Sequence, residues 1–252
     1  MASRVPHGAL LVGGLGLALV GAGVVFSLAE PTARAAPYAA EAAYLRDRGR
    51  RRQLAYGNPA PYLDSIRAAV ARHPELAKRL HVFIALLDQE SGFGPHKESK
   101  TGAAGVAQFT GSGREQVRKL MGEAFWANRY RGEPSLANRL TNFAKPDAFD
   151  PAIAIEAAAL FFAYLLRKRR GNIEAALTDY NAGNRAANLV VSAGSHEAAV
   201  PMLLRLPPKH RSQSPIYAPE VLTRAQFFAT HALPGGIRIG GNALMRCVHH
   251  AA

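Results

Sequence analysis

The sequence predicts a mostly α-helical fold for this chain of 252 residues. Alanine-rich segments that favour helices dominate it, and it lacks the long alternations of Val, Ile and Tyr that half-buried strands need. Its hydrophobic content of 48% and charged content of 19% are typical of a globular protein with a real core. The length suits one good-sized domain or two small ones.

The formal net charge of +13 favours an anionic partner. Nucleic acid, anionic lipid and anionic cell-wall polymer all fit this charge. We expect no nucleic acid, because the sequence has no zinc-finger spacing, no aromatic-basic sheet motif and no heptad-linked basic region. The histidines lie apart except for His249-His250, and no metal-binding, serine-nucleophile or phosphate-binding motif occurs, so we predict no metal and no other cofactor.

Residues 1–35 have the pattern of a signal peptide or a membrane anchor. Arg4 gives a positive start, the stretch 8–29 is uncharged and largely apolar, and Ala33-Arg34-Ala35 has the small-x-small form of a cleavage site. The apolar stretch is also long enough to cross a bilayer, although its glycines weaken it as a stable anchor. With either outcome we expect the rest of the chain to lie outside the cytoplasm.

The composition of residues 36–61 indicates a basic linker. Arginines gather between positions 46 and 52, either as a solvated run or as an attraction to an anionic surface. The breaker Asn58-Pro59-Ala60-Pro61 then begins a folded domain at 62–231. The remaining residues, 232–252, predict a flexible tail. Cys247 is the one cysteine and forms no internal disulfide; it either pairs between chains or stays an unpaired thiol.

The first two helices are expected at 62–73 and 74–89. In the second, five apolar side chains share one face: Leu76, Leu80, Phe83, Ile84 and Leu87. Glu90 continues that face three residues beyond the last of them. A carboxyl there loses hydration, which raises its pKa and suits a general acid that works near neutral pH. The alternative, a surface glutamate at a helix C-terminus, is disfavoured by the helix dipole.

The residues that follow Glu90 have the types that could complete a site. Ser91 offers a hydroxyl to orient the carboxylate, or is an ordinary helix-end serine. Gly102 and Gly105 permit a turn that brings backbone near the glutamate or a ligand. Gln108 is then a polar group that faces a cleft.

Further helices are expected at 112–123, 151–170, 172–180, 184–192, 197–204 and 221–231. The second of these is strongly apolar, with Asp150 as its N-cap and Pro151 in its first turn. The basic run Arg167-Lys168-Arg169-Arg170 indicates the C-terminal end of this helix, where the helix dipole favours cations, more than it indicates a binding patch. The segment 125–146 holds the one tryptophan, Trp126, and either grips glycan by aromatic contact or packs on the domain as an extra helix and loop.

Four short motifs occur in order along the chain. They are Glu90-Ser91-x-Phe93-x-Pro95, Ser99-x-x-Gly102-Ala103-x-Gly105-x-x-Gln108, Thr178–Gly183 and Ser214–Leu222. In residue type and order they resemble the motifs of the soluble lytic transglycosylase (SLT) family, which is lysozyme-like and cleaves bacterial peptidoglycan. Four motifs in the family's order make the resemblance specific.

The resemblance implies a lysozyme-like (goose-type) helical domain with its site around Glu90, the sole catalytic acid and base. It also implies that Tyr217 lies close to this carboxyl. The substrate-binding residues that we infer around it are Ser91, Ser99, Gln108, Tyr180, Asn181 and Tyr217.

Two positions differ from the family's pattern. Val106-Ala107 stands where a larger pair, often Leu-Met, is usual, which leaves that wall of the cleft roomier. Gln213 stands where a glutamate usually precedes the tyrosine.

The resemblance further implies the reaction. Glu90 would protonate the glycosidic oxygen between N-acetylmuramic acid and N-acetylglucosamine, and the substrate's own N-acetyl oxygen would stabilise the sugar cation. Glu90 would then take the proton of the muramoyl 6-hydroxyl, which closes on the anomeric carbon as a 1,6-anhydro product. No second carboxylate is needed. Asp88 is turned away from the Glu90 face of the helix. Asp179 fits an ordinary residue on a helix face at least as well as a second catalytic carboxylate.

We therefore expect a periplasmic lytic transglycosylase that acts on the β-1,4 bonds of peptidoglycan strands. Two alternatives stay open: a hydrolytic muramidase, which needs a second carboxylate across the cleft, and a non-catalytic peptidoglycan-binding module. Size and export alone also motivate the hypothesis of a partner, a secretion or conjugation complex for which the enzyme opens the wall.

Overall fold

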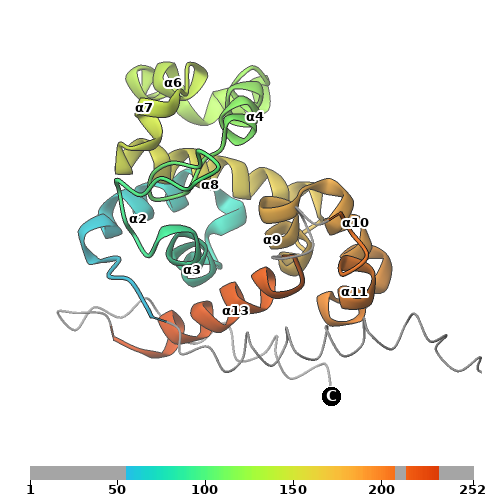
Figure 1. Ribbon diagram of the computed structural model, residues 1–252. Helices are drawn as coiled ribbons and strands as arrows, with labels where there is room; N and C mark the ends of the chain where they lie inside the picture. The colour runs from blue at the N-terminus through green and yellow to red at the C-terminus, as the bar shows by residue number, and fades with distance from the viewer. Residues whose placement is uncertain (1–54, 208–213, 233–252) are drawn as a thin grey trace, which may run out of the picture.

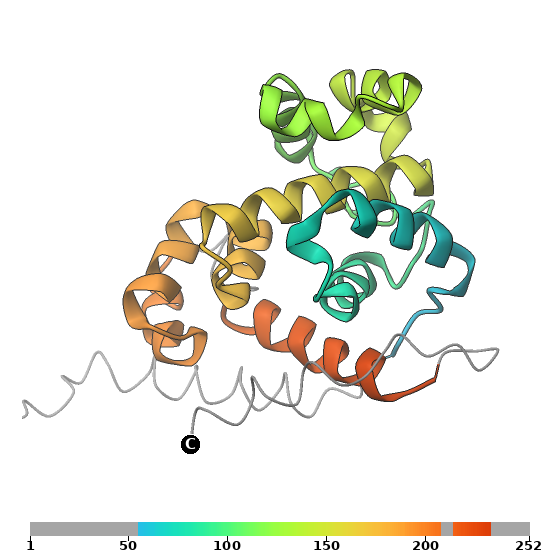
Figure 2. The same cartoon turned by 180° about the vertical axis from the view of Figure 1, so that it is seen from behind.

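Helix α8, Pro151–Lys168, crosses the middle of the protein, and the other helices pack around it (Figures 1 and 2). The structure is a computed structural model that describes residues 55–207 and 214–232. The predicted signal peptide or anchor at 1–35, the linker up to residue 54, Gln213 and the tail after residue 232 lie outside the described residues. Within the described part, no helix is both long and apolar enough to cross a membrane.

Helix α8 begins at the predicted residue and ends at Lys168, just before the predicted end at residue 170. The Asp150 side chain accepts backbone N–H groups of the first turn at 3.0 and 3.4 Å, and Pro151 takes the first helical position. Twelve of its side chains are buried, so the helix forms the centre of the core. Beyond its last residue, Arg170 and Gly171 have positive φ values of 52° and 83°, which end the helical path.

Three groups of helices surround α8 in both views (Figures 1 and 2). One side carries α4 (Gly111–Met121), α5 (Ala124–Ala127), α6 (Pro134–Thr141) and α7 (Lys145–Ala148). The opposite side carries α2 (Leu63–Arg72), α3 (Leu80–Ser91) and α13 (Ser214–Thr230). At the C-terminal end of α8 lie α9 (Ile173–Ala182), α10 (Asn184–Ala193) and α11 (His196–Leu203). Short 3₁₀ turns occur at Ala60–Tyr62, Pro74–Leu76 and Asn128–Tyr130.

The described chain contains isolated β-bridges but no longer strand. The bridges join Glu98 to Ala104 and Ala104 to Phe109, and so fold the glycine-rich segment between α3 and α4 into a compact loop. The mostly α-helical prediction is confirmed.

Two predicted helices differ from the observed ones. The helix predicted at 74–89 is a 3₁₀ turn followed by α3, because the backbone of Arg79 (φ −131°, ψ 21°) leaves the helical region just before Leu80. The helix predicted at 221–231 begins earlier, at Ser214, and runs through Pro219. The motif that contains Tyr217 therefore lies inside a helix and not before one.

The segment 125–146 packs on the domain. Trp126 and Tyr130 are only 2% and 1% exposed, so neither ring can contact a glycan. Trp126 packs edge-on against Tyr164 of α8. Of the two hypotheses for this segment, the glycan grip by Trp126 is wrong, and the extra helices and loop packed on the domain are what the structure shows.

The packed region also begins before residue 62. Tyr56 stacks on Phe227 of α13 with ring centroids 3.7 Å apart, and the Gly57 N–H donates to Asp88 of α3 at 2.7 Å. The end of the predicted linker is thus part of the domain surface. We call residues Ala55, Tyr56 and Gly57 the strap.

Candidate active site

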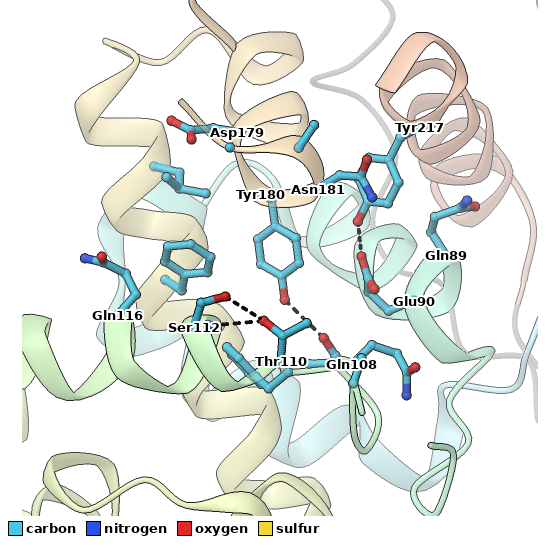
Figure 3. Close-up of a pocket in the computed structure, with 18 of the residues that line it drawn as sticks. Gln89, Glu90, Gln108, Thr110, Ser112, Gln116, Asp179, Tyr180, Asn181 and Tyr217 are labelled. Carbon is cyan, nitrogen blue, oxygen red and sulfur yellow. Dashed lines mark hydrogen bonds between the residues drawn. The ribbon is translucent and has the colours of Figure 1, made fainter. Parts of the chain in front are cut away.

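A cleft of about 790 Å³ opens between the two sides of the protein (Figure 3). Its walls come from the end of α3, the loop 99–110, the first turns of α4, the last half of α8, the end of α9 and the start of α13. Six of the seven residues predicted for the site line it: Glu90, Ser99, Gln108, Tyr180, Asn181 and Tyr217. Ser91 does not line it.

Glu90 lies in the last turn of α3. The helix ends there because Gly92 adopts the left-handed conformation (φ 63°), which glycine reaches without steric cost. Every residue from His81 to Asp88 is buried, and Glu90 itself is partly exposed to the cleft. The helix therefore delivers a carboxyl from the core to the cleft wall.

The surroundings of Glu90 favour its neutral form. Burial is the largest cause and raises the pKa of this carboxyl to about 7, while the Tyr217 hydrogen bond and the positive charge of Lys97 act in the opposite direction. Lys97 also donates to the backbone carbonyl of Glu90 at 3.4 Å. At neutral pH both protonation states of Glu90 are populated, as a group that must give and then take a proton requires.

Tyr217 contacts Glu90 directly. Its hydroxyl donates a hydrogen bond to Glu90 Oε1, across the boundary between α13 and α3 (Figure 3). The tyrosine is 5% exposed, and burial followed by the Glu90 charge raises its pKa well above 10. The hydroxyl is therefore a neutral donor fixed on the carboxyl.

Tyr180 and Asn181 enter the cleft from the end of α9 (Figure 3). The Tyr180 hydroxyl donates to the Ala107 carbonyl at 3.4 Å, and burial and the charge of Glu90 raise its pKa well above 10. These contacts join α9 to the loop that follows α3. The cleft wall near Glu90 thus combines α9 with the loop that follows α3.

The loop between α3 and α4 is as tight as its glycines predict. Gly102 and Gly105 have φ values of 78° and 74°, and a Cβ on Gly105 would lie 1.6 Å from the carbonyl oxygen of Ala148. Gln108 also has a positive φ, 49°, and its amide donates to the carbonyls of Lys97 (3.0 Å) and Gly105 (2.9 Å). Gln108 therefore holds the loop as well as lining the cleft.

The two predicted serines have different surroundings. The Ser91 hydroxyl donates to the Val106 carbonyl at 2.7 Å, so it joins α3 to the loop and does not orient the Glu90 carboxylate as predicted. A buried hydroxyl next to a helix end satisfies the nearest free carbonyl, which here belongs to the loop. Ser99 lies at the cleft, where its hydroxyl contacts that of Thr101 at 2.9 Å and accepts the Ala103 N–H.

Two further carboxylates line the cleft, and both are engaged. Asp179 accepts from Arg169 Nε at 2.8 Å and pairs with Lys168 at 3.0 Å. Glu220 accepts from the Gln89 amide at 2.7 Å. In Figure 3 Asp179 and Glu90 lie on opposite sides of Tyr180. Asp179 and Glu220 therefore each have a fixed polar partner in the cleft wall.

Sequence reasoning missed part of the cleft wall. Phe161, Tyr164 and Lys168 line it from α8, where the spacing i, i+3, i+7 puts them on one face, although we assigned the lysine to helix termination. Ser112 and Gln116 line it from α4, where the spacing i, i+4 puts them on one face. Helical periodicity predicts that these residues share a face of their helix. It does not predict which face of the helix meets the cleft.

The chemistry that the cleft offers is proton transfer. In the described ranges, no three side chains of His, Cys, Asp or Glu gather as a metal site would require. The groups that face a ligand near Glu90 are one titratable carboxyl, neutral phenols and amides. This set can protonate a leaving oxygen and bind hydroxyl and amide groups of a polar polymer.

Comparison with known proteins agrees with this geometry. The family model described as the transglycosylase SLT domain matches residues 69–199, more than half of the chain, and the match includes Glu90, Gln108 and Tyr180. A search of curated proteins found no match. The members of the matched family are lytic transglycosylases, and their substrate is peptidoglycan. With its helical fold and this match, the chain belongs to the SLT transglycosylase family.

Proposed function

We propose that this protein is an active peptidoglycan lytic transglycosylase in which Glu90 alone serves as acid and base. The observation that carries the proposal is the Glu90 carboxyl at the cleft wall, with a pKa of about 7 and a hydrogen bond from Tyr217. A carboxyl in this state is protonated often enough to act as an acid and is a strong enough base afterwards.

The reaction has two proton transfers through the same group. Neutral Glu90 gives its proton to the β-1,4 glycosidic oxygen between N-acetylmuramic acid and N-acetylglucosamine, and the bond from that oxygen to the anomeric carbon breaks. The N-acetyl oxygen of the substrate stabilises the cation. Ionised Glu90 then removes the proton of the muramoyl 6-hydroxyl, whose oxygen bonds to the anomeric carbon. The product is a 1,6-anhydromuramoyl end, and Glu90 is neutral again.

Tyr217 supports both steps by its position. Its donated hydrogen bond stabilises the ionised form of Glu90 that follows the first transfer, because hydrogen bonds to a charged acceptor are the stronger ones. Asp179 and Glu220 support the proposal of a single acid and base, since cationic or amide partners engage both. A hydrolytic reaction would need one of them as a base for water.

Digestion of purified sacculi tests the assignment of Glu90. We expect Glu90→Gln to release soluble muropeptides about 10²–10⁴-fold more slowly than the wild type, because the amide transfers no proton. Glu123→Gln is the matched control, since this glutamate is exposed and lies outside the cleft. Release by Glu90→Gln at the wild-type rate would sink the assignment of Glu90, whereas no release by the wild type itself would favour the non-catalytic binding module.

We also propose that the enzyme acts in the periplasm. The support is the leader-like pattern of residues 1–35, with its positive start and small-x-small site. N-terminal sequencing of protein from the cell envelope tests this; a start near Ala36 agrees with cleavage and an intact start with anchoring. The proposal of a secretion or conjugation partner is tested by deleting the gene, which should impair assembly of that complex without a general growth defect.

A further inference from the structure

The last turn of α3 contacts α13 through three consecutive residues. Glu90 accepts from Tyr217, the Gln89 amide donates to Glu220 Oε2 at 2.7 Å, and Asp88 accepts from Arg224. We call these three contacts the α3–α13 bridge. One end of the bridge is the candidate catalytic carboxyl.

The three contacts of the bridge are linked. Arg224 Nε donates to Gln89 Oε1 at 2.7 Å, so the guanidinium orients the amide whose other end binds Glu220. Asp88 and Glu220 are 2% and 3% exposed, and the Arg224 side chain is 11% exposed. Buried charges that lose one partner are strongly destabilised, so a displacement at Arg224 is transmitted along the bridge.

The strap closes the far end of the bridge. The Gly57 N–H donates to the second oxygen of Asp88 at 2.7 Å, and Arg224 donates to the Ala55 carbonyl at 2.9 Å. The Tyr56 ring stacks on Phe227 at 3.7 Å, and the Arg224 guanidinium lies 5.7 Å from the centre of the same ring. All three strap residues therefore contact α3, α13 or both.

Gly57 shows how closely the strap is fitted. A Cβ at this position would lie 2.4 Å from the Gly92 carbonyl oxygen and 2.9 Å from Asp88 Oδ1. Asp88 lies in the last turn of α3 and Gly92 directly follows that helix, so both are within two residues of Glu90. The backbone can approach the helix this closely only because residue 57 has no side chain.

We propose that the strap is a positioning element of the active site, which holds α13 through the α3–α13 bridge so that the Tyr217 hydroxyl lies on Glu90. The proposal rests on the proposed function for the role of Glu90. The strap and α13 both lie outside residues 69–199, the part that the family model matches. The device thus joins the strap, which none of the four motifs covers, to α13, which carries the fourth motif.

Release of the strap has a chemical signature. The titratable and charged groups that face Glu90 are Tyr217 from α13, Tyr180 from α9 and Lys97 from the loop after α3. Of these, Tyr217 is the one whose position depends on the bridge. Its hydrogen bond lowers the pKa of Glu90, so a weaker bond raises that pKa and moves the alkaline loss of activity to higher pH. Loss of folded protein alone lowers activity without moving the midpoint.

The test compares Gly57→Ala with Gly132→Ala in the full-length protein. A Cβ at Gly132 meets no atom within 4 Å and its backbone is not left-handed, so the same substitution there leaves the strap intact. On soluble peptidoglycan strands we expect Gly57→Ala to lower kcat about tenfold with little change in KM. The midpoint of the alkaline limb should rise by about one pH unit. Gly132→Ala should match the wild type in all three quantities.

A second variant covers the case in which Gly57→Ala does not fold. Tyr56→Ala removes the stacking on Phe227 and keeps the Asp88 contacts, and we expect a smaller change in the same directions. The proposal is overturned if the folded strap variants keep the wild-type kcat and pH profile, or if kcat falls while the midpoint stays. Failure of the proposed function is a separate result, because it would show as activity in Glu90→Gln.

Discussion

The proposed mechanism assigns the chemistry to a single carboxyl, whose pKa depends on its burial and on two neighbours. Burial raises the pKa of Glu90 to about 7, and Tyr217 and Lys97 keep it from rising further. The phenol contributes a donor at a fixed place, whereas exposed Lys97 contributes a charge that solvent screens. At the residue scale, Tyr217 is therefore the more decisive neighbour.

Tyr217→Phe tests that contact with the loss of one oxygen. Without the donated hydrogen bond the ionised form of Glu90 is less stable, so kcat should fall about 10–100-fold and the alkaline midpoint should move upward. Tyr62→Phe is the control, because this tyrosine packs on Phe93 outside the cleft. The pH dependence of the rate of muropeptide release measures both effects. An unmoved midpoint in Tyr217→Phe would contradict the role given to this hydroxyl.

The raised pKa of Glu90 also makes the stability of the protein depend on pH. The carboxyl binds its proton more tightly in the folded state (about 7) than at its ordinary value of 4.5. Its stabilising contribution is complete below about pH 4.5 and is lost as pH rises through about 7. Glutamine does not ionise, so Glu90→Gln should be more stable than the wild type by about 1–3 kcal/mol at pH 8 and nearly equal to it at pH 4.5.

Urea unfolding of both proteins at the two pH values measures this difference. Glu123→Gln, an exposed position, should show no such pH-dependent gain. An equal effect of Glu90→Gln at both pH values would mean that the carboxyl is not desolvated in the folded protein.

At the scale of elements, the loop between α3 and α4 fixes the cleft wall. It is held by its own bridges, by the Ser91 hydroxyl on Val106 and by the approach of Gly105 to α7. Glycine is needed at position 105 because the loop backbone lies directly against the Ala148 carbonyl there. At position 102 it is needed for the backbone conformation alone, since a Cβ on Gly102 meets nothing within 4 Å.

A pair of glycine variants separates these two demands. Gly102→Ala should cost about 1–2 kcal/mol, the cost of a left-handed non-glycine residue. Gly105→Ala should cost at least about 3 kcal/mol, because the same strain is joined by a clash with the Ala148 carbonyl. Urea unfolding measures both. Equal costs for the two variants would contradict the close approach at Gly105.

At the scale of the whole molecule, we expect charge to attract the protein to peptidoglycan. The chain carries +13, and the peptide stems of peptidoglycan carry carboxylates. Raising NaCl from about 0.1 M to about 1 M shortens the screening length from about 10 Å to about 3 Å. We expect the fraction of Glu90→Gln protein that sediments with sacculi to fall over this range. Uncharged chitin is the control polymer, and salt-independent binding to sacculi would contradict a role for charge.

The sequence predicted what depends on local pattern. Asp150 and Pro151 mark the start of α8, Gly102 and Gly105 mark a tight loop, and the apolar face of α3 leads to Glu90. Each of these follows from residues within a few positions of one another. The mostly helical class followed from the same local preferences.

The contacts that the sequence did not predict join distant residues. Asp88 and Arg224 are 136 positions apart, and the sequence around neither residue predicts their contact. Trp126 is of a residue type that often contacts sugars, but here it is buried against α8. Tertiary packing decides which aromatic rings remain exposed. The strap looked like the end of a polar linker, since its fit depends on the surfaces of α3 and α13.

Digestion of sacculi in water enriched in ¹⁸O, with mass spectrometry of the released ends, distinguishes attack by the muramoyl 6-hydroxyl from attack by water. If Glu90 alone gives and takes the proton, the muramoyl ends are 1,6-anhydro and contain no ¹⁸O, because the 6-hydroxyl and not water attacks the anomeric carbon. Glu90→Gln should release almost no such ends. Reducing muramoyl ends labelled with ¹⁸O would contradict the account, since they require water as the nucleophile and a second group to activate it.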